Sequence, residues 1–222
     1  MLLISKLPNW RLEFLGPDVY SADGMITMHD VPFLRNTEFM KAYRAAIKDL
    51  APVFLNKGVP EWKDLDEIAW RSHITTWAAQ KAKPLKGDFV ECGVMYGVLS
   101  LAILDYLKFE ESDNRTFWLV DTWEPMHSDT LQNIYPESLS SLNYFEYIKK
   151  RLERYSRVRF VRGQIPEVLR TLPEFPVAYL GIDMNDGLAE LQALEHFWPS
   201  LVTGAGAYIS MTMVMVKQDM AT

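Results

Sequence analysis

The stretch GDFVECGVMYGVLSLAILDYL, residues 87–107, decides the fold. A short apolar run that contains Glu91 passes through Gly93 and Gly97 into an amphipathic segment with no charge before Asp105. This pattern predicts a strand, a tight turn and a helix. Glycines let the backbone turn close under a ligand, and the first N–H groups of a helix attract an anionic group. The turn is therefore a candidate binding site, although a plain connection without a ligand explains the two glycines equally well.

Short apolar runs alternate with amphipathic segments throughout the rest of the chain. They read DFVECG (88–93), TFWLVD (116–121), VRFVRG (158–163), VAYLGID (177–183) and AYISMTMVMV (207–216). Five strands that alternate with helices predict an α/β fold, with a parallel sheet covered by helices on both faces. Because ligands bind at the carboxyl ends of the strands in such sheets, the residues that end strands are the site candidates.

The N-terminal part has a different pattern. Two helices are predicted, within residues 37–55 and 66–82, from apolar residues at helical spacing. These residues are Phe39, Tyr43, Ile47 and Leu50 in the first helix, and Ile68, Ile74, Trp77 and Ala78 in the second. We expect one domain over residues 1–222, in which residues 1–85 form a helical cover or lid and residues 86–222 form a cofactor-binding core.

Composition and charge narrow the range of partners. The net charge of −6 gives no electrostatic reason to bind nucleic acid or an anionic membrane, both of which favour clustered Lys and Arg. No segment reaches the roughly 20 apolar residues that span a bilayer. Cys92, the single cysteine, is expected to be a buried packing residue, which suits a reducing cytoplasm. A cytoplasmic protein with a small-molecule substrate is therefore predicted.

Acidic and aromatic residues follow the later strands. Asp121 ends the second strand, where this architecture holds ribose hydroxyls, although a loop or helix-capping carboxylate is the alternative. Trp123 could lie against an adenosine, and the segment after the third strand could line an adenine pocket or simply form a turn. The predicted cofactor-binding residues are thus Glu91, Gly93, Gly97, Asp121, Trp123, Gly163 and Gln164.

The spacing E-x-G-x-x-x-G at residues 91–97 differs from the G-x-G-x-x-G of dinucleotide enzymes. It resembles the first motif of Rossmann-like S-adenosylmethionine-dependent methyltransferases, in which the acid helps to hold the methionine end. With WLVDTWEPM, VRFVRGQIPEVLRTLP and YLGIDMNDGLAELQALEHFWPSLVTGAGAYI, the chain resembles the macrocin O-methyltransferase family over roughly residues 65–210. Members methylate sugar hydroxyls on antibiotics and related natural products. The resemblance implies an O-methyltransferase of a small hydroxylated metabolite; a non-catalytic or cofactor-binding-only relative and, more distantly, a dehydrogenase are the alternatives.

Many family members use magnesium, and the resemblance assigns Asp183 to their first metal carboxylate. Asn185 stands where many relatives have a second aspartate, and residues 210–212 read Ser-Met-Thr where the family has an aspartate pair. Magnesium, which prefers hard oxygen ligands, is therefore expected to contribute little. Asp183 is the first candidate for a general base and His127 the second. Asp186 is predicted to be the N-cap of the following helix.

The family resemblance also implies a further helix and two more strands after the fifth strand, whereas only KQDMAT follows here. We therefore expect the C-terminal hairpin to be missing. An uncovered strand edge invites pairing with another chain. We therefore expect the N-terminal segment or a second subunit to cover the edge, and a homo-oligomer, such as a dimer, to form.

Overall fold

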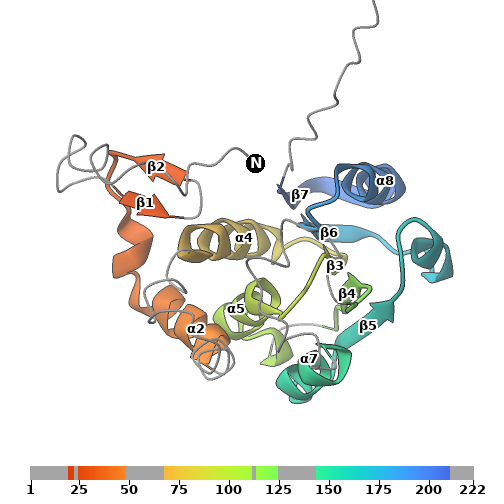
Figure 1. Cartoon of the computed structure of the whole chain (residues 1–222), viewed down its shortest axis with the longest axis horizontal. Helices are drawn as coiled ribbons and strands as arrows, with labels where there is room; N and C mark the ends of the chain where they lie inside the picture. The colour runs from red at the N-terminus through yellow and green to blue at the C-terminus, as the bar shows by residue number, and fades with distance from the viewer. Residues whose placement is uncertain (1–19, 23–24, 49–67, 112–113, 125–143, 211–222) are drawn as a thin grey trace, which may run out of the picture.

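A five-stranded parallel sheet forms the centre of the protein (Figure 1). The computed structural model describes residues 20–22, 25–48, 68–111, 114–124 and 144–210. The strands are β3 (Asp88–Cys92), β4 (Phe117–Asp121), β5 (Val158–Arg162), β6 (Val177–Ile182) and β7 (Leu201–Ile209). They lie in the order β5-β4-β3-β6-β7, and each neighbouring pair is parallel. The predicted α/β fold is therefore confirmed.

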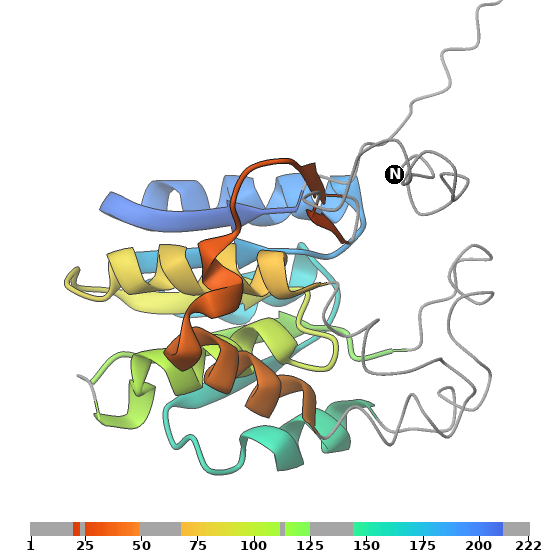
Figure 2. The same cartoon turned by 90° about the vertical axis from the view of Figure 1, so that its left-hand side faces the viewer.

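Helices cover both faces of this sheet. One face carries α2 (Thr37–Lys48), α4 (Ala69–Ala82), α5 (Val98–Leu107) and α7 (Tyr144–Leu152), and the other carries α8 (Gly187–Phe197) (Figure 1). Figure 2 shows α2 and α4 in front of the sheet. All six residues of β6 are buried because it lies between two strands and two helical layers, which explains its uninterrupted apolar sequence.

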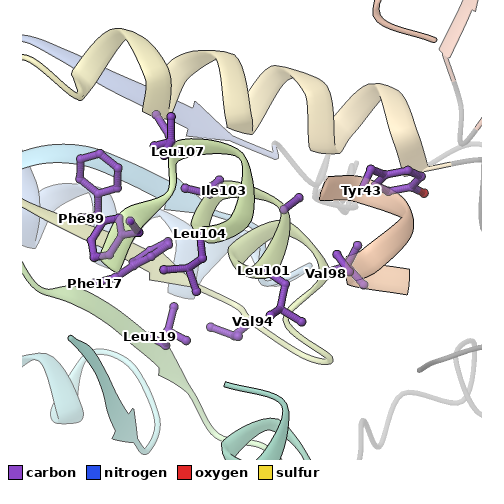
Figure 3. Close-up of a cluster of buried hydrophobic side chains, with 14 of the residues drawn as sticks. Tyr43, Phe89, Val94, Val98, Leu101, Ile103, Leu104, Leu107, Phe117 and Leu119 are labelled. Carbon is purple, nitrogen blue, oxygen red and sulfur yellow. The ribbon is translucent and has the colours of Figure 1, made fainter. Parts of the chain in front are cut away.

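Helix α5 lies at the centre of the larger hydrophobic core. Figure 3 shows its side chains between the sheet, which contributes Phe89, Phe117 and Leu119, and α2, which contributes Tyr43. Burying one such side chain contributes about 1.5–3 kcal/mol. Because α5 is surrounded by α2, α4 and the sheet, most of its residues are buried, which accounts for the lack of charge before Asp105.

Helix α4 forms where the sequence predicts it, but a different face is turned inward. Ile74 and Trp77, at 39% and 53% exposure, lie on the outside. The buried residues are small: Ala69, Ser72, Thr75, Thr76, Ala78, Ala79 and Ala82. A Cβ built on Gly206 of β7 would lie 2.4 Å from the carbonyl oxygen of Ala78, so the helix and the strand approach too closely for larger side chains.

Strand β7 begins at Leu201, six residues before the predicted start at residue 207. The prediction was wrong here because Gly204 and Gly206 are poor strand formers, whereas close packing on α4 requires the small residue at 206. Residues 211–216 of the predicted strand lie outside the described residues. Among the described residues, β7 pairs with β6 alone.

The N-terminal cover contains more than the two predicted helices. Strands β1 (Tyr20–Ala22) and β2 (Met25–Thr27) form a small antiparallel hairpin, and a 3₁₀ turn at Pro32–Arg35 leads into α2. Helix α2 packs on α5, and α4 packs on both α5 and β7, so this part of the chain contributes to the central core. Within the described segments, every helix is too short or too polar to cross a bilayer.

Candidate active site at the carboxyl ends of the strands

The sheet reverses its order of connection between β3 and β6. From β3 the chain continues through α5 to β4 on one side, whereas from β6 it continues through α8 to β7 on the other. Such a switch point opens a crevice at the carboxyl ends of the two strands, where ligands of open α/β sheets bind. Here the backbone N–H of Asp183 donates to the carbonyl oxygen of Cys92 at 2.9 Å. The predicted site residues Glu91, Gly93 and Asp183 are therefore brought together.

Glu91 is a buried carboxyl group at this point, with 2% exposure. One of its oxygens accepts a hydrogen bond from the Ser100 hydroxyl at 2.7 Å. Burial raises the pKa of Glu91 from 4.5 to about 8, and the nearby charges of Asp183 and Asp121 also raise it. The carboxyl group is thus mostly protonated at neutral pH in the free protein. A cationic group placed beside it would favour the ionised form.

Asp121, at the end of β4, holds the loop that follows β3. One carboxylate oxygen accepts from the N–H groups of Val94 and Met95, at 2.7 and 2.9 Å, and the other accepts from the N–H of Trp123 at 2.7 Å. The loop-carboxylate alternative is therefore present in the structure. Since a carboxylate offers about four acceptor positions, one position remains for a ligand hydroxyl.

The two glycines of the first motif are tightly packed against other residues of the chain. Gly93, at φ 84°, has no room for a Cβ, which would lie 2.1 Å from the Asp183 carbonyl oxygen. Gly97, at φ 70°, precedes α5, and a Cβ there would lie 2.3 Å from Cδ1 of Ile148 on α7. Both positions thus require glycine for the turn and for packing, independently of any ligand. Their contact with a cofactor stays a prediction.

Asp183 forms an ion pair with Arg71 of α4, which the sequence did not predict. The Nη1 atom of Arg71 lies 3.0 Å from one carboxylate oxygen and 3.3 Å from the other. The two side chains are only 17% and 12% exposed, for Arg71 and Asp183 respectively. The carboxylate that the sequence assigns to catalysis or metal binding is therefore already paired with an internal cation.

The loop after β6 is held by two other carboxylates. Asp186 caps α8 by accepting from the N–H groups of Leu188 and Ala189, at 3.0 and 3.2 Å, which confirms its predicted N-cap role. The buried Glu190 accepts from the N–H groups of Met184 and Asn185. Glu190 was not predicted, and its place in the first turn of α8, where the helix N-terminus favours an acid, is the signal that could have identified it. Both carboxylates are thus engaged by the backbone at the start of α8.

Trp123 is 4% exposed and packs on Phe145 of α7 and Phe160 of β5, with ring centroids 5.0 and 5.8 Å apart. Its indole nitrogen is buried and has no acceptor within the described part of the chain. Gly163 donates its N–H to the Asp121 carbonyl oxygen at 3.0 Å, and Gln164 is exposed. These residues thus lie at the carboxyl ends of β4 and β5, as predicted.

The sequence analysis also makes predictions for His127 and Cys92. His127, the second candidate for a general base, lies outside the described residues. Cys92 is fully buried in β3, and burial raises the pKa of its thiol well above the ordinary value. A thiol that stays protonated is a poor nucleophile. The packing role predicted for Cys92 is therefore supported.

Backbone strain gathers at the same strand ends. Met95, Trp123 and Asn185 have positive φ angles of 49°, 47° and 58°, and each follows one of the strands β3, β4 and β6. A left-handed conformation at a residue other than glycine costs about 1–3 kcal/mol and is concentrated at binding and catalytic sites. The strain agrees with a functional site at the carboxyl ends of these strands.

Comparisons with known proteins identify the family to which this chain belongs. A family model described as macrocin-O-methyltransferase (TylF) matches residues 75–218. The mycinamicin III 3''-O-methyltransferase of Micromonospora griseorubida is 26% identical over 137 residues, which cover 55% of this chain and 54% of that protein. The chain thus spans about half the length of this curated relative.

Among solved structures, the O-methyltransferase NovP superposes with a TM-score of 0.53 at 17% identity. The match covers 73% of this chain and 78% of NovP, and it shows a shared fold. The fold, the strand-end acids and the family model agree, and the model spans more than half of the chain. The protein belongs to the macrocin-O-methyltransferase (TylF) family.

Proposed function

We propose that the protein is an O-methyltransferase that transfers the methyl group of S-adenosylmethionine to a hydroxyl of a small metabolite, such as a sugar on a natural product. Family membership implies S-adenosylmethionine as the methyl donor. The observation that carries the proposal is the gathering of Glu91, Asp121 and Asp183 at the carboxyl ends of β3, β4 and β6. The name of the mycinamicin relative supports a sugar hydroxyl as the acceptor.

Residues at the strand ends fit the proposed cofactor. Glu91 would ionise beside the ammonium group of the methionine end, because a neighbouring cation offsets the cost of a buried carboxylate. Asp121 has an acceptor position left for a ribose hydroxyl. The buried indole N–H of Trp123, which lacks an acceptor among the described residues, is a donor that a bound molecule could use. The cofactor supplies a methyl group on a sulfonium centre.

Asp183 is the proposed acceptor of the proton. Bound S-adenosylmethionine would supply the methyl group, and a carboxylate oxygen of Asp183 would accept the proton that the substrate hydroxyl loses when its oxygen takes up that group. A neutral hydroxyl is a poor nucleophile, so a base about 3 Å from it is required. His127 remains the alternative base.

The described residues do not fit the magnesium site of the family. Magnesium requires near-octahedral coordination by hard oxygen ligands. No group of three His, Cys, Asp or Glu side chains that could hold a metal occurs within residues 20–22, 25–48, 68–111, 114–124 and 144–210. We therefore propose that magnesium contributes little to the reaction.

Calorimetry followed by a turnover assay tests the proposed function. S-adenosylmethionine should bind with one-to-one stoichiometry, NAD should not bind, and a panel of sugars and glycosylated natural products should contain a methyl acceptor. Binding without turnover on any acceptor would favour the cofactor-binding relative. Failure to bind S-adenosylmethionine, while NAD does bind, would contradict the proposal and favour a dehydrogenase.

A further inference from the structure

Arg71 occupies an unfavourable place for a cation unless it has a specific partner. It is the third residue of α4, and the first turn of that helix contains no acidic residue. The N-terminus of a helix carries about half a positive charge, so a cation there is destabilised. Asp183, brought from the end of β6, supplies the opposite charge. The position of Arg71 is therefore explained by its ion pair at the candidate site.

Arg71 also compensates the charge of Asp183, whose side chain is nearly buried. A carboxylate that is 12% exposed is costly to keep ionised without a counter-charge, and one nitrogen of Arg71 lies within 3.3 Å of both of its oxygens. The negative charge at the end of β6 is thus already compensated within the chain. A divalent cation at Asp183 would have to displace the guanidinium group or share the carboxylate with it.

The remaining side chains around this strand end offer a cation little else. Asn185 is exposed and in a left-handed conformation, and Ser210, just after β7, contributes at most a hydroxyl group. Asp186 is engaged as the cap of α8, and Glu190 is engaged by the loop backbone. The donors that a divalent cation requires are thus committed elsewhere or absent among the described residues.

We propose that Arg71 takes the place of a divalent cation at Asp183, as a positioning residue that compensates and orients this carboxylate so that methyl transfer proceeds without a metal. The proposal rests on the proposed function, because the carboxylate is the proton acceptor of that reaction. Arg71 neither gains nor loses a proton in the step: the hydroxyl proton moves to Asp183, and the sulfonium centre leaves as a neutral thioether. A guanidinium group stays charged at any working pH and is therefore suited to this role.

The metal part of the proposal is tested without an activity assay. Mn²⁺, used as a paramagnetic substitute for Mg²⁺, is titrated into the parent protein and the Asp183→Asn variant and followed by electron paramagnetic resonance. Neither protein should bind Mn²⁺ with a dissociation constant below about 1 mM. Tighter binding by the parent that is lost in Asp183→Asn would overturn the proposal, whether or not the protein binds S-adenosylmethionine.

The positioning part is tested with Arg71→Met and Arg71→Lys, with Arg35→Met as the matched control, because Arg35 forms an exposed pair with Asp30. Arg71→Met should lower kcat about 100-fold and leave the dissociation constant of S-adenosylmethionine unchanged, since misplacement of a reacting group costs about that much. Arg71→Lys, or free guanidinium ion added to Arg71→Met, should restore part of the rate. A kcat within twofold of the parent, or full restoration by Mg²⁺, would overturn it.

Thermal unfolding separates the ion pair from the rest of the proposal. Because Arg71→Met leaves a buried carboxylate without its partner, its thermal midpoint should lie about 10 °C below that of the parent. Adding Asp183→Asn to this variant should recover part of the loss. If the loss of the double variant equals the sum of the losses of Arg71→Met and Asp183→Asn, the two side chains are not coupled, and the proposal is overturned. If S-adenosylmethionine fails to bind the parent, the proposed function fails, whereas the unfolding and Mn²⁺ results still decide on the ion pair.

Discussion

Replacement of Glu91 by Gln should make the free energy of unfolding depend less on pH, because it removes the titration of a buried carboxyl group. In the folded protein, burial raises the pKa of Glu91 from 4.5 to about 8. Between these two values the folded state binds more protons at this residue than the unfolded state does. The free energy of unfolding of the parent therefore falls as the pH rises through this window.

The size of the effect follows from the difference between the pKa of Glu91 in the folded protein and its ordinary value. A tenfold change in proton affinity corresponds to about 1.4 kcal/mol, so the full contribution between pH 4.5 and pH 8 is about 5 kcal/mol. In a practical range from pH 5.5 to pH 7.5, the parent should lose about 2–3 kcal/mol relative to Glu91→Gln, which carries no titrating group at this position. Glu91→Gln should thus become the more stable protein as the pH rises.

Urea unfolding at pH 5.5, 6.5 and 7.5 measures this difference. Glu195→Gln, at an exposed position on α8, is the matched control and should follow the parent at every pH. Parallel stability curves for the parent and Glu91→Gln would refute the reasoning, because they would show that Glu91 has the same proton affinity in both states. S-adenosylmethionine at saturating concentration should flatten the parent's curve, since a nearby ammonium group favours the ionised carboxylate.

The other predictions concern the strand ends and the sheet edge. Gly97→Val should destabilise the fold by about 3 kcal/mol in urea unfolding, because of the left-handed φ and the clash with Ile148. An unchanged stability would contradict this, since it would show that α7 can shift to accommodate the side chain. Asp121→Ala should lower the affinity for S-adenosylmethionine at least about tenfold in calorimetry, since three backbone N–H groups lose their acceptor, and an unchanged affinity would place the ribose elsewhere. Asp186→Ala should cost about 1 kcal/mol of stability without changing that affinity. Sedimentation should show a homo-oligomer, as expected from the edge of β7; a monodisperse monomer with unprotected β7 amides would contradict this.

Local patterns in the sequence were sufficient for the sheet and for the position of the site. The apolar runs at β3, β4, β5 and β6 predict strands within one or two residues. The central strands are covered on both faces, which favours continuous runs of apolar residues. The strand-end acids Glu91, Asp121 and Asp183 follow from those strands. The N-cap role of Asp186 is a similarly local feature.

Contacts between distant segments account for what the sequence did not predict. The inward face of α4 is set by its approach to Gly206, which favours Ala and Ser over Ile74 and Trp77. The ion pair of Arg71 with Asp183 joins residues 112 positions apart. Nothing in the sequence around either residue names its partner, and the acids that precede Arg71 in the chain, Asp66 and Glu67, are nearer candidates than Asp183.

The most direct test of the account is a crystal structure with S-adenosylhomocysteine, the product of methyl transfer. The account predicts its ribose hydroxyls within about 3 Å of the Asp121 carboxylate, its amino group beside Glu91, and its sulfur facing the ion pair of Arg71 and Asp183. Density for the ligand away from the carboxyl ends of β3 and β4, or no ligand at saturating concentration, would contradict the claim that these strand ends form the methyl-donor site.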